Sequence, residues 1–120
     1  MQITGLLAAL AIGAIGTMVG GCNAERKQEC DQFLAALKAL DTTPGSDAVD
    51  RMQSSIQAIQ FQDQPLREYA SSTKATLQVL ANSLKTQASP DAPDGTDDLV
   101  KAKLKEARGE RDDITRYCSQ

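Results

Sequence analysis

The spacing of apolar residues beyond residue 22 limits the fold more than any other feature of this sequence. In that part of the chain, apolar residues recur at steps of three and four positions and are separated by polar and charged side chains. This spacing matches the turn of an α-helix, so each run places its apolar side chains on one helical face. Aromatic residues make up only 3% of the sequence, which leaves an aliphatic core and favours helices over sheets.

The first two helical runs are separated by a turn. The first run extends from about Ala24 to Leu40 and stops at Asp41–Gly45, which contains a proline and a glycine. Ser46 is a good N-cap for the second run, and the acids that follow it suit the positive end of a helix dipole. The apolar positions of the two runs are Cys30, Phe33, Leu37 and Leu40, then Val49, Met52, Ile56 and Ile59.

Proline positions delimit the other two runs. Pro65 fits the first turn of a third helix, where its missing N–H costs little, with Asp63 or Gln64 as the N-cap. The segment 88–95 contains two prolines and a glycine and must be a loop, after which Thr96 is placed to cap the last helix. The apolar positions are Leu66, Ala70, Leu77, Leu80 and Leu84, then Val100, Leu104, Ala107, Ile114 and Cys118.

We predict an all-α fold, a small up-and-down bundle of four helices, because each apolar face can be buried only against the others. A bundle of three helices is the alternative, with one long kinked helix from about Asp47 to Thr86. It stays open because the three-four spacing continues through Pro65 without a phase slip, from Ile59 to Leu66. Both arrangements bring the start of the first helix and the end of the last to the same end of the bundle.

The first twenty-one residues differ in composition from the rest of the chain. Ile3–Val19 is an apolar run rich in alanine and glycine, two more glycines follow it, and no charged residue occurs before Glu25. This composition is typical of a secretory signal peptide. An uncleaved membrane helix is the alternative, because about twenty residues at roughly 1.5 Å each can span a bilayer. Arg26 and Lys27 would then hold the rest of the chain in the cytoplasm.

Val19-Gly20-Gly21-Cys22 resembles the lipobox of bacterial lipoproteins, in which a branched apolar residue and two small residues precede a cysteine. The resemblance implies a signal peptide over residues 1–21, a mature domain over residues 22–120, and a diacylglyceryl group and acyl chains such as palmitate on Cys22. Several acyl chains on one residue anchor a protein stably to a bilayer, where a single chain does not. Asn23, in the position where lipoprotein sorting reads an Asp, favours the outer membrane.

Two cysteines remain once Cys22 is assigned to the lipid anchor. Cys30 and Cys118 lie at opposite ends of the mature chain, and both fall on apolar faces that would meet in one core. In the oxidising compartment of an exported protein, such a pair persists as a disulfide. In the chain-entropy model, a loop of that length restrains the unfolded state by roughly 4–5 kcal/mol. Two separate buried thiols are the alternative.

Three further motifs are spread over the mature chain. Glu29-Cys30 precedes an apolar helical run, Asp63-Gln64-Pro65-Leu66 is followed a turn later by Tyr69, and Glu110–Cys118 lies near the end. Together these loose motifs resemble a group of small, uncharacterised exported proteins of Gram-negative bacteria. The resemblance implies a helical bundle with paired cysteines, and no activity comes with it.

Missing residue types exclude several chemistries. The chain has no histidine, which excludes Ser-His-Asp and Cys-His catalysis in their usual forms, His-ligated haem and di-iron centres built on Glu-x-x-His. Cys30, Cys118 and carboxylates offer too few soft ligands for a common structural zinc site. A net charge of −3 with both signs interspersed gives no basic surface for nucleic acid. The acidic loop residues lack the spacing of an EF-hand, and we interpret them as solvated capping acids: Asp91, Asp94, Asp97 and Asp98.

These observations predict a non-catalytic lipoprotein of the bacterial cell envelope, with a structural role or a protein partner at the membrane. We expect no catalytic residue, no cofactor, no metal and no nucleic acid partner. Only Asn23 and Ala24 separate Cys22 from the first charged helical residues, so the bundle would stand against the bilayer with little reach. The alternative function is a carrier of a small apolar or lipid ligand, held between the helices where alanines and Thr73 leave room.

Overall fold

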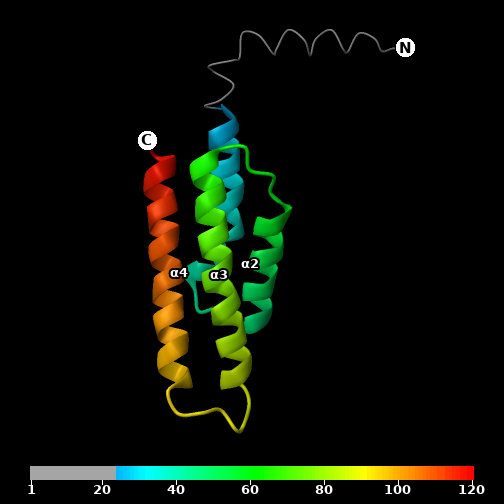
Figure 1. Cartoon of the computed structure of the whole chain (residues 1–120), viewed down its shortest axis with the longest axis vertical. Helices are drawn as coiled ribbons and strands as arrows, with labels where there is room; N and C mark the ends of the chain where they lie inside the picture. Colours follow the sequence, from blue (N-terminus) through cyan, green and yellow to red (C-terminus); the bar gives the residue numbers. More distant parts are fainter. Residues whose placement is uncertain (1–23) are drawn as a thin grey trace, which may run out of the picture.

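A computed structural model describes residues 24–120, which form helices and contain no strand (Figure 1). The described part of the first helix covers residues 24–36. A short 3₁₀ helix η1 (Lys38–Asp41) follows, and then come α2 (Ser46–Ala58), α3 (Gln64–Gln87) and α4 (Thr96–Cys118). The predicted all-α fold is confirmed. The predicted signal peptide over residues 1–21 and the predicted lipid attachment residue Cys22 lie outside the described residues.

The helices alternate in direction along the bundle. The first helix and α3 run from one end to the other, α2 and α4 run back, and α4 ends beside the start of the first helix (Figure 1). With 24 and 23 residues, α3 and α4 are the long pair, whereas α2 has 13. The result is the predicted up-and-down bundle, in which the first helix and α2 pack along the long pair.

A break between α2 and α3 decides between the two predicted topologies. The helix α2 ends at Ala58, Ile59 is extended with φ −81° and ψ 128°, and α3 begins at Gln64. The bundle therefore has four helices, and the predicted long kinked helix is wrong. Pro65 in the first turn of α3 accounts for the break, because in a continuous helix its ring would clash with the carbonyl of residue 61 and it has no N–H to donate to that carbonyl. The spacing of apolar residues carried no sign of this break, because it continues from Ile59 to Leu66 without a phase slip. Within the break, Phe61 is part of the core and is only 9% exposed.

Two predicted helix caps are displaced by one residue. Gly45 is the N-cap of α2 and Gly95 that of α4, so Ser46 and Thr96 are the first residues inside these helices. The Thr96 hydroxyl donates backwards to the Pro93 carbonyl at 2.7 Å instead of capping α4. Gly95 has a φ of 91°, a conformation that glycine adopts at little cost and that sets the entry angle of α4. Only Asp63 caps a helix as predicted.

The first helix tightens before its predicted end at Leu40. Regular α-helix stops at residue 36, and the Leu40 N–H then donates to the Leu37 carbonyl at 2.9 Å, a 3₁₀ bond. This tighter turn keeps both leucines fully buried. The side chain of Arg108 on α4 holds the end of the turn, because its guanidinium donates to the carbonyls of Leu40 at 2.9 Å and Thr42 at 2.8 Å.

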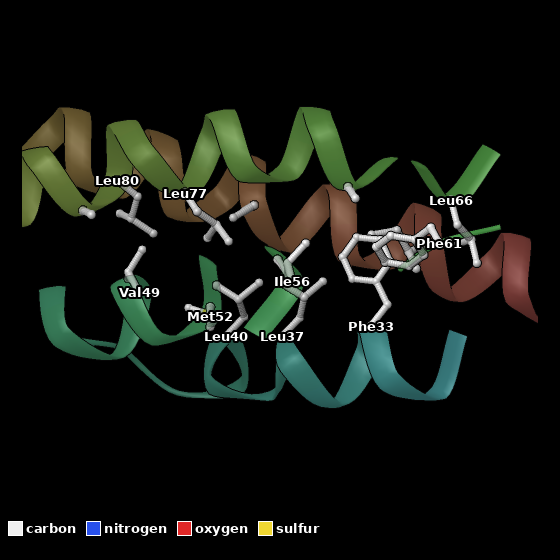
Figure 2. Packing of buried hydrophobic residues seen from close by; sticks show 14 of the residues in the cluster. Phe33, Leu37, Leu40, Val49, Met52, Ile56, Phe61, Leu66, Leu77 and Leu80 are labelled. Carbon is white, nitrogen blue, oxygen red and sulfur yellow. The ribbon is translucent and has the colours of Figure 1, made fainter. Parts of the chain in front are cut away.

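The predicted apolar faces meet in one core. Figure 2 shows aliphatic side chains of the first helix, η1 and α2 pointing towards those of α3. The rings of Phe33 and Phe61 pack against each other with their centroids 5.1 Å apart and their planes tilted by 57°. Most of the predicted face residues are buried, and Ile59, Leu84, Leu104 and Cys118 are half-buried at its edge. The core also holds hydroxyl side chains that the apolar spacing did not mark, namely Thr73, Thr76, Ser83 and Thr96.

Candidate functional site

A disulfide joins the first helix to α4. Cys30 and Cys118 are bonded across 88 residues, with their Cα atoms 5.9 Å apart, and Cys30 is buried at 3% exposure. The predicted pairing is confirmed, and the alternative of two separate thiols is wrong. The bond lies at the end of the bundle where the first helix begins and α4 ends (Figure 1). It therefore fixes the two ends of the described chain to each other, and Cys30 follows the predicted attachment residue Cys22 by eight residues in the sequence.

Glu29, the residue before the bridged Cys30, holds the segment between α2 and α3. Its carboxylate accepts the backbone N–H of Gln62 at 2.9 Å and that of Asp63 at 3.1 Å. The side chain is buried at 7% exposure, and a buried carboxylate is tolerated only when donors of this kind satisfy it. The break between α2 and α3 thus receives from Glu29 the hydrogen bonds that a continuous helix would have supplied.

Asp63 connects α3 to α4. Its Oδ2 accepts the Leu66 N–H at 3.2 Å, which caps α3, and also accepts the Tyr117 hydroxyl at 2.7 Å. Burial raises the pKa of Tyr117, and the hydrogen bond to Asp63 raises it further, so the phenol keeps its proton and remains the donor. The ring of Tyr69 lies 6.0 Å from that of Tyr117 and covers it from α3.

Arg26 covers Tyr117 from the first helix. Its guanidinium carbon lies 5.2 Å from the centre of the Tyr117 ring, a cation–π contact, and one of its nitrogens donates to the Gln120 carbonyl at 3.0 Å. The three loose motifs of the sequence therefore converge at this end of the bundle. We call the residues of this assembly the disulfide cluster: Arg26, Glu29, Cys30, Asp63, Tyr69, Tyr117 and Cys118.

The disulfide cluster joins segments and offers no evident reaction chemistry. Both oxygens of Glu29 and the capping oxygen of Asp63 are occupied by donors from other segments of the chain. The pairing of the two cysteines was predicted from the sequence, whereas the network of Glu29, Asp63 and Tyr117 was not. One feature of the sequence could have indicated the role of Glu29. It directly precedes Cys30, a predicted core residue of the same helix, so its carboxylate was placed to be buried.

A shallow groove lies beside the cluster, between the first helix and α2. It measures about 860 Å³, is open to solvent, and has alanines among its lining residues. Two acids, Glu25 and Glu29, line one part of it, and no Lys or Arg is among the lining residues. Its amide side chains are Gln28, Gln32, Gln60 and Gln62. Because this groove is open to solvent, it would leave much of an apolar ligand in contact with water.

A second polar cluster lies where α3 meets α4. Glu110 accepts the hydroxyls of Ser72 at 3.1 Å and Thr76 at 3.0 Å, and burial raises its pKa above the usual range. Thr73 is fully buried, and its hydroxyl has no hydrogen-bond partner among the described residues. Glu106 also accepts from Thr76, at 3.3 Å. Within residues 24–120, no group of three or more His, Cys, Asp or Glu side chains is placed to hold a metal ion.

No protein family, curated protein or solved structure matches this chain. In the part of the chain that the structure describes, every helix is too short or too polar to cross a membrane.

Proposed function

We propose that this chain is a non-catalytic lipoprotein of the bacterial cell envelope, held at the bilayer by acyl chains on Cys22 and acting through a structural role or a protein partner. The observation that carries the proposal is the distance along the chain between Cys22 and the bundle. The first helix is already formed at residue 24. Two residues of chain span at most about 7 Å, so the Cα atom of Cys22 can lie no farther than this from the Cα atom of Ala24. The disulfide end would then face the bilayer directly.

The disulfide cluster supports this orientation because it connects the first helix, which follows Cys22, to both long helices. A force applied at Cys22 reaches the first helix, and the Cys30–Cys118 bond passes it to α4. Glu29 links the same helix to the start of α3 through the backbone of Gln62 and Asp63. A disulfide is also what an exported protein retains, because the envelope outside the cytoplasm is oxidising.

The packing of the core favours a structural or partner-binding role over carriage of an apolar ligand. Aliphatic side chains fill the space between the four helices (Figure 2). Thr73, which the carrier hypothesis needs as part of a ligand space, is fully buried. The groove beside the disulfide cluster is open to solvent and encloses no ligand space. Ligand carriage would therefore require the helices to separate.

Metabolic labelling with a palmitate analogue tests the proposal. We expect the wild-type protein to take up the label and the Cys22→Ala variant to lose it completely, because no other residue would carry acyl chains. The matched control is the double variant Cys30→Ala/Cys118→Ala, which removes the other two cysteines and should stay labelled. An unlabelled wild-type protein, or label that persists in Cys22→Ala, would contradict lipid attachment at Cys22.

A further inference from the structure

Two exposed aliphatic side chains meet at the end of the bundle opposite the disulfide. Among residues 24–120, only Val79 on α3 and Leu99 on α4 are large hydrophobic residues with high exposure, at 39% and 43%. Both line one groove of about 490 Å³ beside the loop that joins these helices (Figure 1). We call it the distal groove; its main lining residues are Val79, Ser83, Thr86, Pro93, Thr96 and Leu99.

The distal groove differs from the groove beside the disulfide cluster in the surface that it exposes. Aliphatic and proline carbons from two helices and a loop converge there, so an apolar side chain that enters it leaves water on several sides at once. Exposed aliphatic residues are ordinary when they are scattered singly over a surface. Here the two that the described chain exposes line a single hollow, which points to a contact surface.

One acidic side chain lines the distal groove, and two more line an adjoining hollow. Asp94 lines the groove and also this hollow, which it shares with Asp97 and Asp98. The chain from residue 86 to residue 100 contains four Asp and no Lys or Arg. Asp97 accepts a hydrogen bond from Gln87 at 2.8 Å, whereas Asp94 and Asp98 form no ion pair with any residue in the described range.

The lysines on the flanking turns offset only part of this charge. Lys101 lies one helical turn after Asp97 and Asp98 and forms no ion pair within residues 24–120, so it brings one positive charge against the four Asp, and the other two flanking lysines are paired elsewhere. Lys85 pairs with Asp50 at 3.2 Å, and Lys103 pairs with Glu106 at 3.0 Å. An apolar slot with an adjoining acidic hollow is complementary to a ligand that carries both an aliphatic group and a positive charge. An anionic lipid surface has the wrong charge for this end of the molecule.

We propose that the distal groove binds a basic peptide segment of another envelope protein. An aliphatic side chain of that segment occupies the slot between Val79 and Leu99, and a Lys or Arg one or two residues away faces Asp94 and Asp98. One short segment reaches both hollows because Asp94 and Gly95 belong to both. This inference rests on the proposed function, since it names the surface and the chemistry of the protein partner. The length of α3, about 36 Å for 24 residues, would place this contact well away from the bilayer.

Peptide titration of the full-length, isotope-labelled protein in detergent micelles tests the inference by nuclear magnetic resonance. The probes are three acetylated pentapeptides, Gly-Lys-Leu-Lys-Gly, Gly-Glu-Leu-Glu-Gly and Gly-Lys-Ser-Lys-Gly. We expect the first to shift the amide signals of Thr86, Gly95 and Leu99 and to bind at least about fivefold more tightly than either of the others, because only it satisfies both hollows.

Two variants and one matched control locate the contact. Leu99→Ser should weaken binding of the Lys-Leu-Lys peptide about fivefold, and Asp94→Asn/Asp98→Asn should weaken it by a similar factor and remove its dependence on salt. Asp47→Asn removes an exposed acid from α2 and should change nothing. All four positions are exposed, so the fold should persist, and a melting curve checks it.

Several results would overturn the inference. Equal binding of the acidic peptide, or full binding by Leu99→Ser, would exclude this groove as a site for basic segments. A dimer that forms with rising concentration and is lost in Leu99→Ser would assign the groove to a second copy of the chain. Absence of peptide binding in a protein whose Cys22 is lipidated would refute the distal groove and leave the proposed function standing.

Discussion

At the disulfide end of the bundle, polar groups from three segments are buried or half-buried and bonded to one another across the fold. At the loop between α3 and α4, polar side chains bond instead to near neighbours in the chain. Glu29 and Asp63 connect positions more than thirty residues apart. At the other end, Thr96 bonds to Pro93 and Gln87 to Asp97. The disulfide end is therefore built to hold helices in place, and the distal end is free to present side chains.

Removing the disulfide should produce the largest effect on stability. The double variant Cys30→Ala/Cys118→Ala is expected to lower the free energy of unfolding by about 2–5 kcal/mol, because the unfolded chain regains the freedom that the bond across 88 residues removes. Urea denaturation with and without reductant measures it. The wild-type protein in reductant should unfold like the variant, and a loss below about 1 kcal/mol would mean that the bond contributes little.

Glu29→Ala should have the next largest effect. It leaves the N–H groups of Gln62 and Asp63 without their acceptor, which is expected to cost about 1–3 kcal/mol. Amide hydrogen exchange should accelerate at these two positions before it does in α4. Glu25→Gln, a change at an exposed acid one turn earlier, is the control and should leave both stability and exchange unaltered. Unchanged exchange at Gln62 in Glu29→Ala would remove Glu29 from this role.

Tyr117→Phe tests how much a single hydrogen bond contributes at the disulfide end, because it removes one hydroxyl oxygen from the disulfide cluster. Loss of the hydrogen bond to Asp63 should lower the free energy of unfolding by about 0.5–1.5 kcal/mol, measured by urea denaturation. Tyr69→Phe removes the hydroxyl of the neighbouring ring, for which no hydrogen bond is seen within residues 24–120, and should have a smaller effect. Equal effects of the two variants would show that the aromatic packing, and not the bond to Asp63, connects α3 with α4.

Glu110, between the two ends of the bundle, should give the smallest effect, and one that depends on pH. Burial raises the pKa of its carboxyl in the folded state, so folding disfavours the charged form. The cost of burying the charged carboxylate is fully present at neutral pH. Stability should therefore rise as the pH falls through the raised pKa of the folded state, because the carboxyl then takes up a proton. Glu110→Gln should raise the free energy of unfolding by a few tenths of a kcal/mol at neutral pH, a small gain because solvent screens the charge of this partly exposed group. In melting curves recorded at several pH values, the variant should show a weaker dependence of stability on pH. A variant that is less stable at neutral pH would show that the hydrogen bonds from Ser72 and Thr76 outweigh burial.

The helices could be predicted because local spacing determines them. The steps of three and four located α2, α3 and α4, and Pro65 with Asp63 marked the start of α3 correctly. The cysteine pair followed from the same faces, because a bundle with an even number of helices returns to its starting end. The break after Ala58 was predicted from Pro65 and the capping residues before it, and not from the apolar spacing, which continues from Ile59 to Leu66 without a phase slip.

The polar contacts could not be predicted because they depend on which segments fold against each other. Glu29 has the same local sequence signal as any helical acid, and only the packing of the segment before α3 gives it two N–H donors. The distal groove was missed for a related reason. Val79 and Leu99 lie off the apolar faces of their helices, so nothing in the spacing brought them together.

The central claim is that the disulfide end of the bundle is tethered to a membrane through Cys22, and the intact mass of the protein purified from its native membrane tests it most directly. We predict a mass equal to residues 22–120 plus acyl chains, lighter by two hydrogens before reduction than after it. A mass that begins at Met1, carries no acyl chain and does not change on reduction would contradict both the tether and the disulfide.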